Sequence, residues 1–176
     1  MMGSRSRCVI DASVIIDLYN GGLLKDIINL PFAFFTPDIV LAEHTNPSPD
    51  VVLRSGISVE DLPGVLVQQA TELVPLNRRL SIQDLFAFVL ARHHGCLLIT
   101  GDGRLRKLAK QQTMECHGIL WVMEMMIEHR TLSPASADTA LGIIMAKNSR
   151  LPAEECEERR RAWRKMQDNS PAANPE

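Results

Sequence analysis

Several features that mark specialised classes of protein are scarce in this 176-residue sequence. Aromatic residues make up only 5%, which argues against a protein that stacks single-stranded bases on aromatic rings. An excess of positive charge is also missing, because 19 Lys and Arg face 21 Asp and Glu, so charge alone does not indicate a nucleic-acid binder. No apolar run approaches the roughly 18–20 residues that span a membrane. The 45% hydrophobic and 23% charged residues are typical of one folded domain with a small extension.

Cysteines are few and lie far apart in the sequence. They form no C-x-x-C pair and no zinc-like spacing with the histidines, so we expect reduced thiols at Cys8, Cys96, Cys116 and Cys156. The first seven residues are polar and lead directly into a strand pattern, which predicts no secretory signal. These features together predict a cytoplasmic protein with no membrane partner.

Short apolar runs alternate with segments of helical spacing along most of the chain. Strands are predicted at residues 8–10, 32–35, 57–59, 96–99 and 115–118. Helices are predicted at residues 12–19, 23–30, 37–44, 63–74, 82–94, 104–112, 118–129, 134–147 and 152–167, with Thr36 as the N-cap of the third. This alternation predicts an α/β fold, in which helices cover both faces of a central parallel sheet and two further helices follow.

The same pattern divides the chain into three parts. Residues 7–130 hold the alternating elements and form the predicted main domain. Residues 131–167 form a C-terminal helical extension, whose role the sequence does not indicate. Residues 168–176 are rich in Pro, Asn and Ser, and we expect a disordered tail there.

Four acidic residues lie at sequence positions that an α/β fold would bring to one edge of its sheet. Asp11 and Asp102 follow predicted strands, and Asp84 begins the helix that leads to the second of these strands. Each of the three has a structural alternative as a helix cap, and Glu43 has one as a solvated surface acid. Ligands of open α/β sheets bind outside the carboxyl ends of the strands, which is where these acids would meet. Carboxylate oxygens favour Mg²⁺ or Mn²⁺ over Zn²⁺.

At this point the sequence resembles a known family. The segments 9–13 (VIDAS), 36–43 (TPDIVLAE), 81–84 (SIQD) and 98–105 (LITGDGRL), in this order, are similar to those of PIN domains. PIN domains are metal-dependent ribonucleases, and many are VapC-type toxins of toxin–antitoxin pairs. The resemblance covers about residues 7–130, and the two C-terminal helices resemble a subgroup with such an extension.

The resemblance implies a set of site residues and a reaction. Asp11, Glu43, Asp84 and Asp102 would hold Mg²⁺ or Mn²⁺, with support from the hydroxyls of Ser13 and Thr100. Many members carry a fifth acid beside the fourth, whereas here glycine stands on both sides of Asp102. The implied reaction is hydrolysis of RNA that leaves a 5′-phosphate and a 3′-hydroxyl. An antitoxin protein and a second copy of the chain are the implied protein partners.

Basic residues near the fourth acid are candidates for phosphate contacts. The helix after Asp102 carries four positive charges, and we expect these to bind RNA, although a solvated helix face explains them equally well: Arg104, Arg106, Lys107 and Lys110. Further candidates are Arg78, Arg79 and Arg92.

Other functions remain open alternatives from sequence alone. A PIN-like module that binds RNA or protein without cutting would use the same edge of the sheet. A phosphatase or a receiver-like phosphotransfer domain is a weaker alternative, because Asp11 has no acidic neighbour of the kind that a receiver needs. A dinucleotide-binding domain is weaker still, because residues 11–13 replace its glycine-rich turn.

Overall fold

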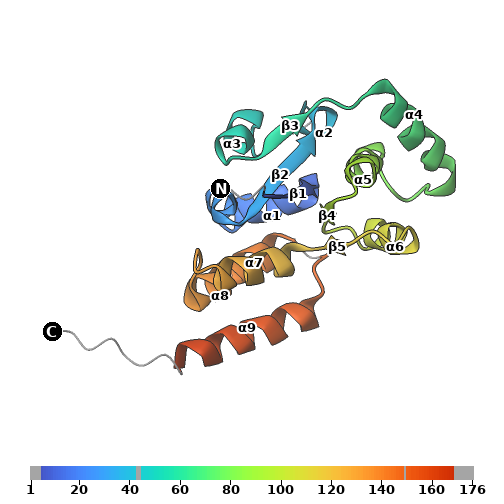
Figure 1. Cartoon of the computed structure of the whole chain (residues 1–176). Helices are drawn as coiled ribbons and strands as arrows, with labels where there is room; N and C mark the ends of the chain where they lie inside the picture. The colour runs from blue at the N-terminus through green and yellow to red at the C-terminus, as the bar shows by residue number, and fades with distance from the viewer. Residues whose placement is uncertain (1–4, 43–44, 149, 169–176) are drawn as a thin grey trace.

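The computed structural model describes residues 5–42, 45–148 and 150–168 (Figure 1). Its centre is a five-stranded sheet in the order β3-β2-β1-β4-β5, in which every neighbouring pair of strands is parallel. The strands are β1 Ser6–Ile10, β2 Phe32–Pro37, β3 Ser58–Glu60, β4 Leu97–Ile99 and β5 Cys116–His117. The predicted parallel α/β sheet with helices on both faces is therefore confirmed.

The central strands are apolar at every buried position because both faces of the sheet are covered. Cys8, Val9 and Ile10 of β1 have no exposed surface, although consecutive side chains point to opposite faces. Val9 belongs to one hydrophobic core and its two neighbours to the other. The sheet thus separates two cores, one on each face.

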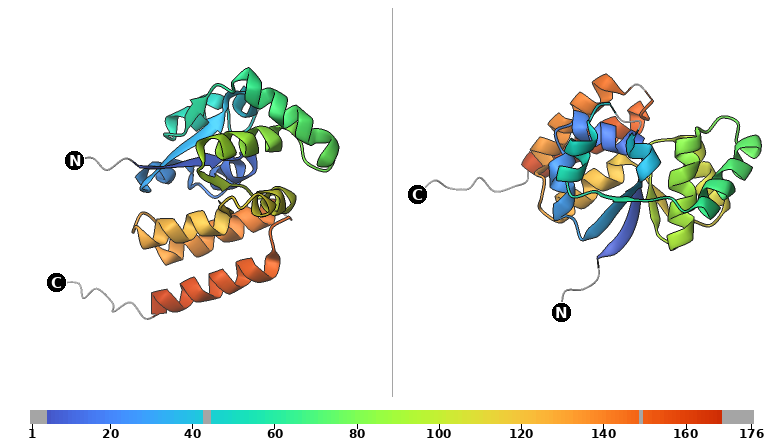
Figure 2. Two further views of the ribbon diagram at one scale, coloured as in Figure 1. Left: turned by 45° about the vertical axis from the view of Figure 1, so that its right-hand side comes forward. Right: turned by 90° about the horizontal axis from the view of Figure 1, so that it is seen from above.

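The helices form a layer on each face of the sheet (Figures 1 and 2). The first core lies under α4 Gly64–Leu73, α5 Ile82–His94 and α6 Gly103–Gln111. The second lies under α1 Ala12–Asn20, α7 Ile119–Glu128 and α8 Pro134–Lys147, and α9 Ala153–Asp168 packs outside α8. Shorter elements are η1 Leu24–Asn29, α2 Asp38–Ala42, α3 Pro49–Arg54 and η2 Val74–Leu76.

The last two helices share a core with the sheet. Cys156 and Trp163 of α9 are buried in the same cluster as Ile10 of β1. Asp138 of α8 also pairs with two arginines of α9, at 2.6 Å from Arg160 Nε and 2.8 Å from Arg164 Nε. Within the described ranges, no helix combines the length and the apolar character that crossing a membrane requires.

Three sequence predictions differ from the structure. Thr36 and Pro37 continue β2 instead of starting a helix, and the buried Thr36 hydroxyl has no hydrogen-bond partner in the described part of the chain. Residues 24–29 form a 3-10 helix where an α-helix was predicted, and α3 was not predicted. Of the remaining predicted positions, 43 and 44 and the tail 169–176 lie outside the described residues, and Asp168 belongs to α9.

Candidate active site

A cleft opens at the carboxyl ends of β1 and β4, where the strand order reverses direction. Its volume is about 670 Å³. Three of the predicted acids line it, namely Asp11, Asp84 and Asp102, together with Ser13 and Arg104. The fourth predicted acid, Glu43, lies outside the described residues.

Hydroxyl groups hold the Asp11 side chain from two sides. Thr100 Oγ1 donates to Asp11 Oδ2 at 2.7 Å, and Ser13 Oγ donates to the same oxygen at 2.9 Å. Both hydroxyls are held in turn by backbone amides, since Asp102 N donates to Thr100 and Gly101 N donates to Ser13. The backbone of Asp11 is fixed to β4 by its own amide, which donates to Ile99 O at 2.9 Å. Ser13 and Thr100 therefore orient the Asp11 side chain.

Asp11 is a buried acid without a cationic partner. Only 2% of the residue is exposed, and no ion pair reaches it in the part of the chain that the structure describes. Burial raises the pKa of the Asp11 carboxyl, and the negative charge of Asp84 adds to that rise. The hydrogen bonds from Thr100 and Ser13 lower the pKa but do not offset burial. The site therefore favours a positive charge beside Asp11.

Asp84 and Asp102 each cap a helix with one carboxylate oxygen. Asp84 Oδ2 accepts from Ser81 N at 2.8 Å in a capping box at the start of α5. Asp102 Oδ1 accepts from Arg104 N and Leu105 N at the start of α6. The other oxygen of each acid has no hydrogen-bond donor among the described residues. Each side chain thus combines its capping bond with an oxygen left for a ligand.

The chemistry of these donors fits Mg²⁺ or Mn²⁺. All three acids offer carboxylate oxygens, which these hard cations prefer as ligands. A divalent cation would also supply the positive countercharge that the buried Asp11 carboxylate lacks. Among residues 5–42, 45–148 and 150–168, no three His, Cys, Asp or Glu side chains are grouped closely enough to hold a metal ion. A complete ligand set from this cleft therefore needs the predicted Glu43 or a rotation of the capping acids.

Comparison with known proteins identifies the family of the chain. A family model described as PIN domain matches residues 7–165. The chain belongs to the PIN-domain family. PIN domains are generally nucleases and typically use divalent metal ions. The match extends through α8 and over most of α9, and no curated protein matches the chain.

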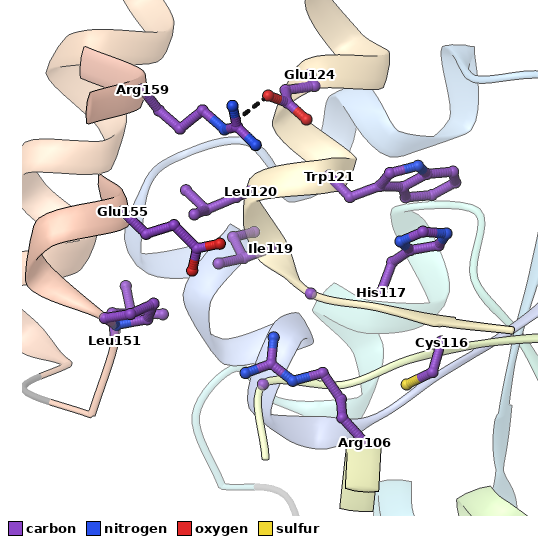
Figure 3. A pocket seen from close by; sticks show the side chains of 13 residues that line it. Arg106, Cys116, His117, Ile119, Leu120, Trp121, Glu124, Leu151, Glu155 and Arg159 are labelled. Carbon is purple, nitrogen blue, oxygen red and sulfur yellow. Dashed lines mark ion pairs between the residues drawn. The ribbon is translucent and has the colours of Figure 1, made fainter. Parts of the chain in front are cut away.

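The predicted basic residues of this PIN domain lie on different faces of α6. Arg104 and Lys107, one turn apart, line a common hollow. Arg106 lines a separate pocket of about 240 Å³ between β5, α7 and α9, and Figure 3 shows its guanidinium directed into that pocket. Lys110 is exposed and lines neither hollow. The four basic residues lie close together in the sequence, but the geometry of the helix directs them to different parts of the surface.

The pocket in Figure 3 also shows how α9 meets the PIN domain. Arg159 of α9 forms an ion pair with Glu124 of α7, with 2.8 Å between Nε and Oε1. His117 stacks on Trp121, with ring centroids 4.6 Å apart. A Cβ at Gly118 would come within 3.0 Å of Arg106 Nη1, so glycine leaves room for that guanidinium. This pocket lies beside the acidic cleft, with which it shares Gly101 and Leu151.

One buried acid near the cleft was not singled out from sequence. Asp17 is 2% exposed, and Asn148 Nδ2 donates to both of its carboxylate oxygens, at 3.0 and 3.1 Å. Burial raises the pKa of Asp17, while the Asn148 amide and the charge of Arg150 lower it. The position of Asp17 three residues after Val14, on the apolar face of α1, is the signal that could have identified it. The contact brings Asn148 and Arg150 to the rim of the cleft.

Proposed function

We propose that this PIN-domain chain is a divalent-metal-dependent endoribonuclease that hydrolyses RNA phosphodiester bonds in the acidic cleft. The observation that carries the proposal is the buried Asp11, which forms no ion pair among the described residues and shares one cleft with Asp84 and Asp102. Burying an unpaired carboxylate is unfavourable unless a ligand compensates it. Family membership supports the general nuclease activity, and the three acids that line the cleft support its location there.

In this proposal Asp11, Glu43, Asp84 and Asp102 hold Mg²⁺ or Mn²⁺. When bound, such ions lower the pKa of an attacking water and stabilise the leaving oxygen. The protein's own part is to fix the acids: Thr100 and Ser13 hold Asp11 in one orientation. The capping bonds hold Asp84 and Asp102 at helix N-termini, where the helix dipoles stabilise their negative charge.

Arg104 is placed to meet the substrate at the same cleft. It follows the capping residue Asp102 in the first turn of α6, and its side chain lines the cleft. A guanidinium there would bind a phosphate oxygen of the RNA beside the reacting bond. The expected products carry a 5′-phosphate and a 3′-hydroxyl.

The first prediction concerns the Asp11→Asn variant of the full chain. With Mn²⁺ or Mg²⁺ and an end-labelled single-stranded RNA, the unmodified chain should cleave, and EDTA should stop it. Asp11→Asn should lower the cleavage rate by more than the roughly 10–100-fold that loss of an outer-shell partner costs a metal site. Denaturing gels measure the rate, and end analysis identifies the products.

A matched variant controls for the general effect of removing a carboxylate. Glu128→Gln makes the same chemical change at an exposed position near the end of α7, outside the cleft lining. It should cleave at the unmodified rate. Metal-dependent cleavage that persists undiminished in Asp11→Asn would show that the acidic cleft is not the active site. Metal binding and RNA binding with no cleavage by any variant would favour the non-catalytic binding module.

The biological role that we propose is that of a toxin in a toxin–antitoxin pair. The partner would be an antitoxin protein that blocks the acidic cleft, and a homodimer is the alternative assembly. We place the protein in the cytoplasm, because its four free cysteines suit a reducing compartment. Growth arrest on expression, relieved by Asp11→Asn, is the outcome that this role requires.

A further inference from the structure

A second hollow beside the acidic cleft carries positive charge. Its volume is about 490 Å³, and it lies between the segment 75–80 and α6. Four cationic side chains line it and no carboxylate does, and we call it the basic groove: Arg78, Arg79, Arg104 and Lys107. The whole chain has a net charge of −2, so this local excess is not a consequence of composition.

The residues of the basic groove are held on anchored backbone. Leu80 is 9% exposed, and its amide donates to Asn77 O at 2.8 Å. The Asn77 side chain in turn donates to Leu73 O at the end of α4. On the opposite wall, α6 packs into the core through Leu105 and Leu108. The groove is therefore a built feature with two fixed walls.

In the described part of the chain, the side chains of the four groove cations have no partner. Arginines elsewhere in the described chain form ion pairs, as Arg7 does with Glu60 and Arg164 with Asp138. None of the four groove side chains forms an ion pair or a side-chain hydrogen bond among residues 5–42, 45–148 and 150–168. Unpaired like charges in one concavity repel one another, and a bound polyanion would relieve this repulsion.

The groove and the acidic cleft adjoin at one shared residue. Arg104 lines both of them, so a chain of phosphates that leaves the cleft at Arg104 would next meet Lys107 and then Arg78 or Arg79. Leu76, which is 80% exposed, adds an apolar surface at the edge of the groove for a base. A positively charged groove that follows the backbone is the usual device for binding single strands.

We infer that the basic groove binds the phosphates of a single-stranded RNA beside the cleavage site and so defines the path of the substrate. The inference rests on the proposed function for the identity of the polyanion. Of the candidates named from the sequence, it selects Arg78, Arg79, Arg104 and Lys107 and leaves out Arg92, Arg106 and Lys110. With no aromatic residue in the groove, contacts to phosphate dominate, so binding is salt-dependent and tolerant of sequence.

The second prediction is tested in the full chain with the Asp11→Asn change, so that binding is measured without cleavage. The probe is a fluorescein-labelled single-stranded RNA, and anisotropy is recorded over a series of salt concentrations. Lys107→Gln and Arg79→Gln should each weaken binding severalfold and reduce the slope of log affinity against log salt by about 0.7. Lys165→Gln removes an exposed charge on α9, outside the lining of the groove and of the cleft, and should change neither quantity.

The outcomes separate this inference from the proposed function. If the unmodified protein cleaves RNA but Lys107→Gln and Arg79→Gln bind like Lys165→Gln, the inference is wrong and the nuclease assignment stands. If no variant cleaves but the two groove variants lose affinity, the groove stands and the nuclease assignment is wrong. Tighter binding of duplex RNA, or of polyglutamate, than of the single strand would also overturn the inference.

Discussion

Asp11 is a buried acid whose charge no ion pair neutralises within the described residues. Its carboxylate is almost wholly buried, receives two hydroxyl hydrogen bonds and has a raised pKa. For folding alone, an amide at this position would be better, because it would accept the same hydrogen bonds without burying a charge. The charge therefore lowers the stability of the metal-free protein, which is typical of a residue retained for ligand binding.

The third prediction is that, because of Asp11, the stability of the metal-free protein depends on pH. Because the pKa of Asp11 is higher in the folded state than its ordinary value of 3.8, the folded protein binds that proton more tightly. The stabilising effect of protonation is complete below about pH 3.8 and is lost as pH rises through the folded pKa. In EDTA at pH 7, Asp11→Asn should thus melt about 2–4 °C higher, the shift produced by about 1 kcal/mol in a chain of this size.

The measurement includes its own control. Melting temperatures of the two proteins should converge as the pH falls toward 3.8, because Asp11 is then protonated in both states. At pH 7, added Mg²⁺ should raise the melting temperature of the unmodified protein more than that of Asp11→Asn. A variant less stable than the unmodified protein in EDTA would show that Asp11 has a mainly structural role.

The C-terminal helix α9 is attached by one apolar anchor region and one cluster of ion pairs. Cys156 and Trp163 are buried, whereas most other side chains of α9 are exposed. Asp138 of α8 receives three hydrogen bonds from Arg160 and Arg164. These bonds lower the pKa of the Asp138 carboxyl, and those from Arg164 have the largest effect. Because exposed ion pairs contribute little, the apolar anchor should dominate the attachment.

The fourth prediction compares two positions on α9. Trp163→Ala removes a side chain that is 2% exposed and should lower the free energy of unfolding by about 3–5 kcal/mol. Met166→Ala, one turn further along at 51% exposure, should change it by less than about 0.5 kcal/mol. Urea unfolding followed by circular dichroism measures both. Equal effects of the two changes would mean that Trp163 is not the anchor.

Local sequence signals determined how well each element could be predicted. The bounds of α5 were predicted to the residue, because Ser81 and Asp84 form the expected capping box and Gly95 adopts the left-handed conformation with a φ of 58°. Thr36 and Pro37 carry an equally good helix-start signal, yet pairing with β3 keeps both in the sheet. The 3-10 helix η1 and the short helix α3 could not be recognised, because neither has a helical periodicity of sufficient length in its sequence.

An acidic site and a basic site lie next to each other at one end of the sheet. The acidic cleft and the basic groove adjoin there through Arg104, although the net charge of the chain is only −2. The sequence predicted that Asp11, Asp84 and Asp102 would lie at this end, because each of the three follows a strand or begins a helix. The sequence could not show which cations lie together, because Arg79 and Lys107 come from segments 28 residues apart that only the fold brings together.

The fifth prediction asks whether the extension 131–167 is a separate unit. Its helices share a core with β1, α1 and α7, so we expect one cooperative unfolding transition for the chain. In a Trp121→Phe variant, the fluorescence comes from Trp163 alone and reports on α9, while circular dichroism reports on all helices. The two urea midpoints should coincide. An earlier fluorescence transition would show that α9 unfolds before the rest of the chain and that the chain is not one cooperative unit.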